Sequence, residues 1–352
     1  MRVLLCERNF SGHRKKYLEG LLKVSDIEFF CYAPENVGVD AEHFIPYSAA
    51  KERSLAEYRA WIRTIKQVVR RDRIDVVHIL DGDSIMRYFG WGFGRFKVPR
   101  LVITYHHFFP GLIRRISYLC MSGRRNCVSV AHTQSVREKL LAAGVKTVEL
   151  CGYPAFDFHR IAQRSAEAAK KYWKLPDHIP AIGIVGGMCS YKNILPFLET
   201  LSSVKGKFAL LICGKESDVT EVQIRQAVRA YEDRTVLKIE KLSEEEYELA
   251  IAASDIIFCI YSHVFDGASG PLTDGVCAGK MILSCAHGSL GNIVRSWHLG
   301  LTAECEDRDE VLERTEQVLA QCGSWKYDEL AGAYRQQLMP EAFRERYREI
   351  YL

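Results

Sequence analysis

Residues 254–285 read SDIIFCIYSHVFDGASGPLTDGVCAGKMILSC, and their pattern is the strongest indication of an α/β fold in the chain. The run Asp255–Tyr261 is apolar and β-prone, which predicts a buried strand. A polar, glycine-rich loop follows, Pro271 favours the start of a helix that ends near Gly279, and Lys280–Ser284 is typical of the next strand. Such an arrangement forms an anion site, because backbone N–H groups and the positive end of the helix dipole point into the loop.

Two carboxylates bracket this loop, Asp266 and Asp274, which are eight residues apart. Asp266 is expected at the mouth of the loop. Asp274 is expected one turn into the helix, where it can accept hydrogen bonds from two vicinal hydroxyls, the usual role of a carboxylate beside a ribose. The stretch therefore predicts an anion site with a carboxylate that binds hydroxyls.

The stretch resembles the donor-site signature of retaining glycosyltransferases of the GT-B fold, family 4. In that family two Glu residues flank seven others, with a glycine-rich loop and a proline between them. This sequence keeps the spacing, the first glycine and the proline, but has Asp at both ends and Ser269-Gly270 where Gly-Leu is usual. The resemblance implies that Asp266 is a catalytic residue that acts on the sugar. It also implies a set of donor-binding residues in this stretch: Gly267, Ala268, Ser269, Gly270, Pro271, Leu272 and Asp274.

The length of 352 residues is too great for one typical domain and fits two, and an apolar fraction of 48% is enough for sizeable cores. No uninterrupted apolar run reaches the roughly 18 residues of a membrane span. The first residues, MRVLLC, lead directly into a strand rather than a secretory signal, so we expect a cytoplasmic protein. The 12 cysteines contain no C-x-x-C pair, which favours small core residues in a reducing compartment over a metal cluster.

The charge is distributed unevenly. Residues 1–165 hold 27 Lys/Arg against 16 Asp/Glu, whereas residues 166–352 hold 21 against 28. A basic half favours an anionic surface or acceptor, although a solvated basic face is an equal alternative. Phe108–Cys127 combines aromatic and aliphatic residues with four arginines and is the best candidate for an interfacial or lipid-acceptor surface. The alternative is an ordinary helix.

The N-terminal half alternates predicted strands with helical patterns, which indicates a parallel, doubly wound sheet with function at the carboxyl ends of its strands. Residues 55–73 predict an amphipathic helix with a basic exterior, for which membrane docking is a minority alternative. No G-x-G-x-x-G follows the first strand, which argues against a dinucleotide site there. The predicted strands are Arg2–Cys6, Ile27–Tyr32, Asp75–Leu80, Arg100–Thr104, Cys127–Ala131 and Thr147–Cys151.

Two loops of this half follow strand ends. The loop after the first strand resembles the first loop of the family, which implies that Gly12 and His13 bind the acceptor; a structural turn is the alternative. After the fourth strand, His106 matches a family histidine that contacts hydroxyls of the donor sugar, which implies a catalytic role. Histidine suits this role because it can donate or accept at neutral pH, and a histidine satisfied by backbone is the alternative.

The second half begins with a predicted strand, Ala181–Gly186. The family pattern that follows is Gly-Arg, five residues, and then Lys before Gly or Asn. Lys192 and Asn193 match it, whereas Gly187 stands at the position of the Arg. The resemblance implies that Lys192 is catalytic and binds the donor diphosphate, together with Gly186 and Gly187. A solvated surface lysine is the alternative.

A strand is also predicted at Phe208–Cys213, and Thr235–Ile239 with Glu240–Glu245 resembles the segment that holds the nucleotide base. The fold implied is α/β, with two Rossmann-like doubly wound domains facing each other across a cleft. The expected divisions are an acceptor-binding domain at 1–165, a nucleotide-sugar-binding domain at 166–335, and a C-terminal helix at 336–352 that crosses back to the first domain.

The resemblance implies retaining transfer of a sugar from a nucleoside-diphosphate sugar, of UDP or GDP type, to a glycan or lipid-linked acceptor. Synthesis of cell-surface polysaccharide or glycoconjugate is the expected setting, with no metal, no cofactor and no nucleic acid. Peripheral association with an anionic membrane, on the inner face of the plasma membrane, would accompany a lipid-linked acceptor. Two alternatives stay open: a non-catalytic GT-B subunit that binds a partner or glycan, and a sugar-nucleotide epimerase of the same fold.

Overall fold

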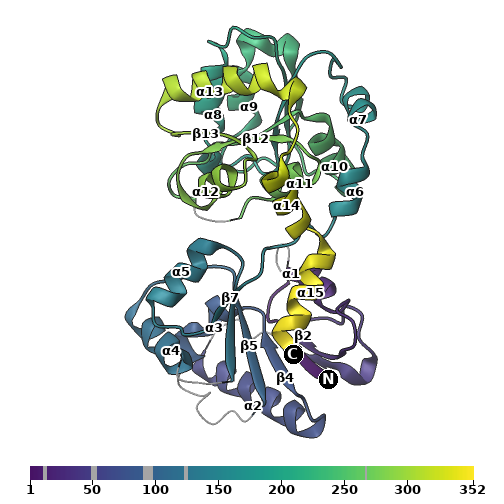
Figure 1. Cartoon of the computed structure of the whole chain (residues 1–352), viewed down its shortest axis with the longest axis vertical. Helices are drawn as coiled ribbons and strands as arrows, with labels where there is room; N and C mark the ends of the chain where they lie inside the picture. The colour runs from purple at the N-terminus through teal and green to yellow at the C-terminus, as the bar shows by residue number, and fades with distance from the viewer. Residues whose placement is uncertain (11–13, 49–53, 90–97, 123–125, 266–267) are drawn as a thin grey trace. The chain divides into compact units, whose positions relative to one another are not determined.

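The computed structural model describes residues 1–10, 14–48, 54–89, 98–122, 126–265 and 268–352 (Figure 1). The chain forms two compact units, one of Met1–Phe156 with Pro340–Leu352 and one of Asp157–Met339. Within the described ranges, no helix has the length and apolar character needed to cross a bilayer.

The first unit contains a parallel sheet of seven strands in the order β3-β2-β1-β4-β5-β6-β7. The six strands predicted for this half are confirmed, and no end differs by more than one residue. The additional strand, β3, has three residues and pairs with β2 at the sheet edge. The strands are β1 (Arg2–Cys6), β2 (Glu28–Ala33), β3 (Phe44–Pro46), β4 (Val76–Ile79), β5 (Arg100–Tyr105), β6 (Cys127–Ala131) and β7 (Val148–Leu150).

Helices cover both faces of this sheet, as a doubly wound fold requires. One buried cluster joins the sheet to α2, α3, α4 and α5, and a second joins it to α1 and α15. The predicted amphipathic helix is α2, which Ser54 caps by accepting a hydrogen bond from the backbone N–H of Glu57 at 3.2 Å. The helices are α1 (Arg14–Leu21), α2 (Leu55–Arg71), α3 (Gly82–Phe89), α4 (Leu112–Ser122), α5 (Gln134–Ala142) and α15 (Pro340–Tyr351).

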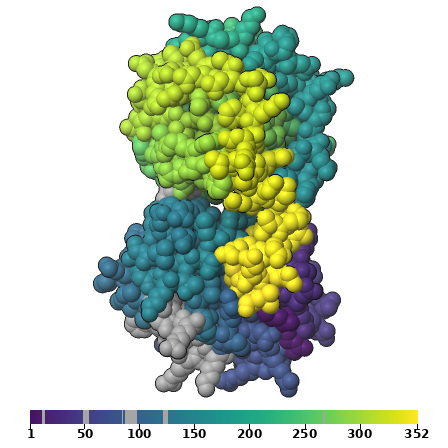
Figure 2. Space-filling model, in the orientation of Figure 1, coloured from purple at the N-terminus to yellow at the C-terminus, as the bar shows by residue number. Residues whose placement is uncertain are grey.

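The C-terminal helix α15 contributes polar side chains to the interior of this unit. The Tyr351 hydroxyl lies 2.7 Å from Nδ1 of His78, and Nε2 of the same ring lies 2.8 Å from the Thr104 hydroxyl. That hydroxyl is also 2.9 Å from the Tyr347 hydroxyl, which in turn bonds to Tyr17. All five side chains are buried, and Figure 2 shows the yellow end of the chain beside the purple N-terminal residues. The last residues of the chain therefore complete the core around β1, β4 and β5.

The second unit contains six parallel strands in the order β10-β9-β8-β11-β12-β13. Numbered within the unit, this is 3-2-1-4-5-6, the strand order of a Rossmann fold. The strands are β8 (Ala181–Val185), β9 (Ala209–Cys213), β10 (Thr235–Lys238), β11 (Ile256–Cys259), β12 (Met281–Cys285) and β13 (Gly300–Ala303). Its helices are α6 (Phe158–Gln163), α7 (Ala166–Tyr172), α8 (Ile194–Leu201), α9 (Glu221–Ala227), α10 (Glu244–Ala253), α11 (Gly270–Cys277), α12 (Gly288–Ser296), α13 (Arg308–Gln321) and α14 (Glu329–Gln337).

The polar stretch that precedes Pro180 is part of this second unit. It forms α6 and α7, and both helices pack against α10. Arg164 pairs with buried Glu248 at 2.8 Å, and Lys170 pairs with Asp255 at the same distance. These ion pairs hold the stretch to α10 and to the residue before β11, and the unit begins at Asp157 rather than at residue 166.

Candidate functional site

The second sheet reverses its strand order between β8 and β11, and ligands of doubly wound folds bind outside the carboxyl ends of the strands at such a point. The loop after β8 approaches the loop after β9 very closely. Gly186 has a φ of +98°, and a Cβ on Gly214 would lie 2.0 Å from the carbonyl oxygen of Gly186. Only glycine fits at Gly214, because any side chain would overlap this backbone.

Lys192 lies at the end of the loop after β8, in a short turn, Ser190–Lys192. The next residue, Asn193, has a φ of +52°, a left-handed conformation that Gly and Asn tolerate best. The Lys192 side chain is buried, and its Nζ lies 3.4 Å from the Val185 carbonyl oxygen; no carboxylate of the described residues pairs with it. Burial lowers the pKa of Lys192, so contact with an anion would stabilise its charged form.

The N-terminus of α11 meets this lysine. Ser269 caps the helix by accepting a hydrogen bond from the backbone N–H of Leu272 at 3.3 Å, and Pro271 stands in the first turn. A Cβ on Gly186 would lie 3.2 Å from the Nζ of Lys192 and 3.8 Å from Cγ of Pro271. The lysine and the positive end of the helix therefore converge on one place at the switch point.

Asp274 lies one turn into α11, where its Oδ2 accepts a hydrogen bond of 2.7 Å from the Tyr247 hydroxyl. The Cβ position of Gly270 is 4.0 Å from this oxygen, so the carboxylate lies beside the first residue of the helix. Sequence reasoning did not find Tyr247, because it reaches Asp274 only through the packing of α10 against α11. Burial, followed by the charge of Asp274, raises the pKa of Tyr247.

The structure describes only one of five further residues that were predicted for the site. Asp266 and Gly267 lie outside the described residues, and so do Gly12 and His13. The fifth, Ala268, is exposed.

Gly187 stands where the family has an Arg, and other groups surround it. A Cβ on Gly187 would lie 3.6 Å from Sγ of Cys189 and 4.0 Å from the Lys215 carbonyl oxygen.

His106 follows β5 in the first unit. Its Nε2 lies 3.1 Å from the Leu80 carbonyl oxygen, and because a carbonyl only accepts, this nitrogen carries the proton. Burial, followed by the charge of Arg14, lowers the pKa of His106 to about 3. The ring is therefore neutral near pH 7 and offers Nδ1 as a hydrogen-bond acceptor.

Two buried carboxylates lie where the strand order of the first sheet reverses, after β1 and β4. Glu7 accepts hydrogen bonds from the backbone N–H groups of Arg8 and Asn9, at 2.8 and 3.0 Å, and pairs with Arg14 at 3.2 Å. Asp81 pairs with Nε of Arg8 at 3.2 Å. Burial and the charge of Asp81 raise the pKa of Glu7 to about 8. With Arg8 and Arg14, the two groups form a buried ionisable network at the edge where the fold predicts a ligand.

His132 is a further residue that sequence reasoning missed. Its ring centroid lies 5.0 Å from that of His106, and its Nδ1 lies 2.8 Å from the Cys151 carbonyl oxygen. Its Nε2 is buried without a hydrogen-bond partner in the described part of the chain. Burial lowers the pKa of His132 to about 3. Their positions in the sequence could have identified these residues as site candidates. Glu7 and His132 directly follow β1 and β6, and Asp81 follows β4 after one residue.

Glu7 predicts a pH dependence of stability. Its pKa is about 8 in the folded chain against an ordinary 4.5, so the folded state binds more protons between these values. The free energy of unfolding is therefore expected to fall as pH rises from about 4.5 to about 8. Glu7→Gln should flatten this dependence in urea denaturation at several pH values. Glu28→Gln, which alters a largely exposed carboxylate of β2, is the control, and an unaltered slope in Glu7→Gln would contradict the prediction.

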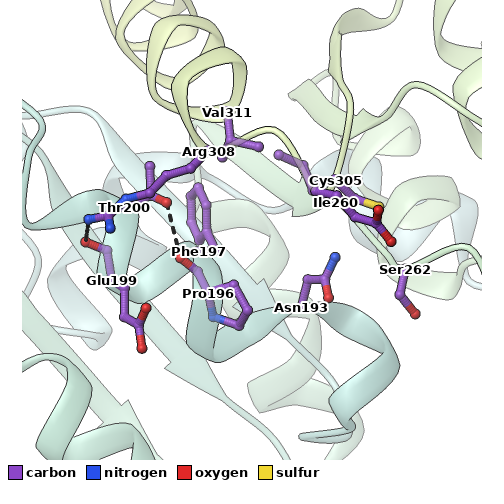
Figure 3. A pocket seen from close by; sticks show the side chains of 11 residues that line it. Asn193, Pro196, Phe197, Glu199, Thr200, Ile260, Ser262, Cys305, Arg308 and Val311 are labelled. Atoms are coloured by element: carbon purple, nitrogen blue, oxygen red, sulfur yellow. Dashed lines mark hydrogen bonds between the residues drawn. The ribbon is translucent and has the colours of Figure 1, made fainter.

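A pocket of about 360 Å³ adjoins the loops of the second unit (Figure 3). Phe197 of α8, Ile260 after β11 and Val311 of α13 give it an apolar side, and Asn193 and Ser262 are among its polar residues. The backbone N–H of Ser262 donates to the carbonyl oxygen of Tyr191 at 2.7 Å, which joins the loop after β11 to the turn that holds Lys192. The volume is within the range of small-ligand sites.

No family model and no curated protein matches the sequence. Solved structures do match over nearly the whole chain. A glycosyltransferase from Rickettsia africae has a TM-score of 0.74 and 15% identity, and the match covers 99% of this chain and 97% of that one. Anabaena HepE in complex with UDP has a TM-score of 0.74 and 12% identity, with 99% of both chains covered. The lipopolysaccharide outer core galactosyltransferase WaaB has a TM-score of 0.71 and 14% identity, covering 99% of this chain and 98% of that one. With two parallel sheets that match these structures, the chain has the GT-B fold of two Rossmann-like domains.

Proposed function

We propose that the chain is a retaining glycosyltransferase of family 4 that moves a sugar from a nucleoside-diphosphate sugar to a glycan or lipid-linked acceptor. The observation that carries this proposal is the buried ammonium of Lys192 beside Gly186 and the N-terminus of α11. A diphosphate has the charge and size to bind both groups at once. The structure of Anabaena HepE with UDP-glucose supports a donor of this class.

Sugar transfer from such a donor requires stabilisation of the leaving diphosphate. Charge grows on the β-phosphate as the glycosidic bond breaks, and Lys192 with the N–H group of Gly270 and the positive end of the α11 dipole would stabilise it. The departing phosphate oxygen can take the proton of the acceptor, so no strong protein base is required. His106 suits a supporting role, because its neutral ring can accept a hydrogen bond from a sugar hydroxyl. We also assign Asp266 to the sugar and Gly12 and His13 to the acceptor.

A non-catalytic GT-B subunit is the second candidate, favoured by Gly187 at the position of an expected arginine. A panel of UDP and GDP sugars separates the candidates. An enzyme is expected to gain thermal stability with one donor and to release its nucleotide when an acceptor is added. A subunit that binds without turnover would show only the stabilisation. An epimerase would convert the donor with no acceptor present.

Asp274→Asn is expected to weaken nucleotide binding by about 1–3 kcal/mol, because Asp274 would accept hydrogen bonds from the ribose hydroxyls. Tyr247→Phe removes the hydroxyl that orients this carboxylate and should cost less. Asp309→Asn, on the exposed first turn of α13, is the matched control. Calorimetric titration with UDP and GDP measures the effect. If Asp274→Asn bound nucleotide as tightly as Asp309→Asn does, the assignment of Asp274 to the ribose would be wrong.

We further propose that α4 contacts an anionic membrane that carries a lipid-linked acceptor. Its apolar side chains are exposed by 76% at Leu112, 49% at Ile113, 47% at Ile116 and 50% at Leu119. An apolar row beside basic residues is typical of helices that lie at the membrane surface. Arg114 and Arg115 lie on the same helix, whereas Arg124 and Arg125 fall outside the described residues.

The protein is therefore expected to bind vesicles that contain phosphatidylserine at low salt and to detach as ionic strength rises. Replacing Arg114 and Arg115 together by Glu should weaken this binding by at least about 1 kcal/mol for each arginine. The matched control replaces Arg63 and Arg70, two exposed arginines of α2, by Glu. Sedimentation with vesicles measures the bound fraction. Equal losses in the two double variants would assign the binding to net charge rather than to α4.

A further inference from the structure

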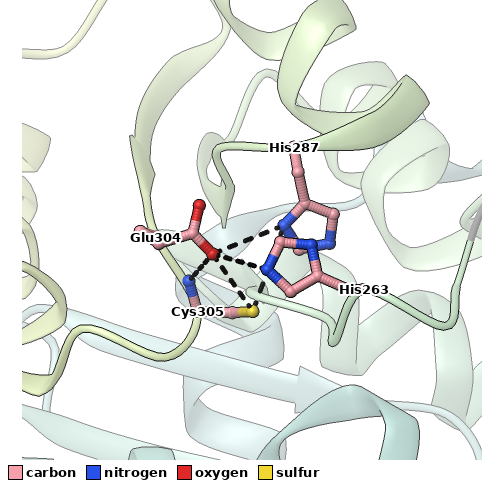
Figure 4. A group of neighbouring side chains, drawn as sticks. All are labelled: His263, His287, Glu304 and Cys305. Atoms are coloured by element: carbon pink, nitrogen blue, oxygen red, sulfur yellow. Dashed lines mark hydrogen bonds and ion pairs between the residues drawn. The ribbon is translucent and has the colours of Figure 1, made fainter.

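Four side chains that metals commonly bind meet at the carboxyl edge of the second sheet (Figure 4). His263 lies in the loop after β11, His287 at the start of α12 after β12, and Glu304 and Cys305 in the loop after β13. No metal cluster was expected from the sequence, because it contains no C-x-x-C pair. The parallel sheet brings the four residues together, since the ends of β11, β12 and β13 are neighbours along one edge.

The separations between the four ligand atoms are those of a compact site. Oε1 of Glu304 lies 2.9 Å from Nε2 of His263, 3.8 Å from Nδ1 of His287 and 3.5 Å from Sγ of Cys305. Sγ and Nδ1 of His287 are 4.0 Å apart, and all pairs lie within 4.8 Å. Bond lengths of about 2.0–2.3 Å around tetrahedral zinc place neighbouring ligand atoms about 3.3–3.5 Å apart. The four atoms are close enough to surround one ion after the His263 ring has turned toward the others.

We propose that His263, His287, Glu304 and Cys305 bind one Zn²⁺ ion. A set with two imidazoles, one carboxylate and one thiol suits zinc better than Mg²⁺ or Ca²⁺, which prefer oxygen ligands. This site is separate from the place where Lys192 meets α11, and its existence does not depend on the proposed transferase activity.

The surroundings fit a site that an ion can enter. The side chain of His263 is 50% exposed and its ring stacks on His287, with centroids 3.8 Å apart and an angle of 25° between the planes. Coordination by both rings requires a rotation of His263, and its exposure allows this. Nε2 of His287 is buried without a partner among the described residues, so this ring makes its polar contacts through the nitrogen that faces the cluster.

The thiol of Cys305 donates toward Glu304 when no metal is bound. An ordinary cysteine thiol keeps its proton near pH 7. Zinc binding would replace the S–H bond by a Zn–S bond and release this proton to the solvent. The carboxylate would then bind the ion instead of accepting from the thiol.

A bound ion would tie together three strand-end loops of the second unit. The loop that carries His263 continues to Ser269, the cap of α11, so zinc would restrict the segment that leads into the anion site. Cys305 and Ser262 also line the pocket beside Asn193. Zinc would therefore stabilise the second unit and fix the loop after β11.

The test uses the full chain, stripped with a chelator and titrated with zinc chloride in a calorimeter. One ion per chain is expected, with a dissociation constant below about 1 µM and release of about one proton from the thiol, seen by comparing buffers. Cobalt(II) gives an independent signature, because a cobalt–thiolate bond and a tetrahedral ligand set alter the absorption spectrum. Cys305→Ser should abolish the thiolate band and the proton release, and His287→Gln should weaken zinc binding at least about tenfold.

Two matched variants control for surface binding. Cys322→Ser removes another half-buried cysteine of the same unit, and His298→Gln removes a histidine that also pairs with a carboxylate, Asp328. Both should keep the site, and thermal unfolding should shift upward with zinc in both but not in Cys305→Ser. The proposal is overturned if zinc does not bind, or if cluster and control variants bind it equally well. Neither result would bear on sugar transfer, which is measured separately with nucleotide sugars.

Discussion

Lys192→Ala is expected to lower turnover of the nucleotide sugar by at least about 100-fold, comparable to the loss of one oxyanion donor. Gly187 stands where a second cation is expected, so Lys192 is the cation that the loop itself would bring to the diphosphate. Its charge should count more in the transition state than in the ground state, because the leaving phosphate gains charge as the bond breaks. The affinity for nucleotide sugar should therefore fall less than turnover. Steady-state kinetics with titration calorimetry separates the two effects.

Two further variants make this result interpretable. Lys192→Arg should recover part of the turnover, because it keeps the charge with a different shape. Lys207→Ala, an exposed lysine of the same unit, is the matched control and should keep full activity. Near-normal turnover in Lys192→Ala would mean that another group neutralises the diphosphate, and Lys215, whose carbonyl lies beside Gly187, would be tested next.

Gly214→Ala is expected to destabilise the second unit by more than about 3 kcal/mol and to weaken nucleotide binding at least about tenfold. Two costs add: its φ of +141° disfavours any side chain, by about 1–3 kcal/mol, and the new Cβ would lie 2.0 Å from the Gly186 carbonyl oxygen. The backbone of Gly186 must move, and with it the loop that reaches Lys192. Urea denaturation and nucleotide titration measure the two effects.

Gly111→Ala separates these costs. Gly111 has nearly the same φ, +142°, but a Cβ there would meet nothing within 4 Å. This variant should show only the conformational cost and should leave nucleotide binding intact. If Gly214→Ala were no worse than Gly111→Ala, the close approach to Gly186 would not be what fixes the loop.

The sequence predicted the fold because each buried strand is a continuous apolar run between glycine or polar loops. Arg2–Cys6 and Cys127–Ala131 were placed with their observed bounds, and β11 and β12 were found on either side of the Pro271 helix. The short strands β3, β10 and β13 were not predicted as strands, because each has only three or four residues and mostly half-buried side chains. An apolar run is too short to predict a strand where few of its residues are buried.

The candidate site was only partly predictable, for a different reason. Lys192, Ser269 and Asp274 were found because loop chemistry and spacing are local properties of the sequence. Tyr247 was not, because its contact with Asp274 joins two helices across 27 residues of chain. The four residues of the proposed zinc site are likewise brought together by strand order, which spacing along the chain does not show.

The core of the first unit has a consequence for the order in which the two units fold while the chain is made on the ribosome. Phe343, Tyr347, Ile350 and Tyr351 complete a core that otherwise consists of residues from the first half of the chain. Domains usually fold from the N-terminus onward during synthesis, but here the first sheet lacks part of its interior until residues 340–352 have been synthesised. The second unit, which is continuous from Asp157 to Met339, needs no later residue. The half of the protein that is translated first is thus the half that can complete its folding last.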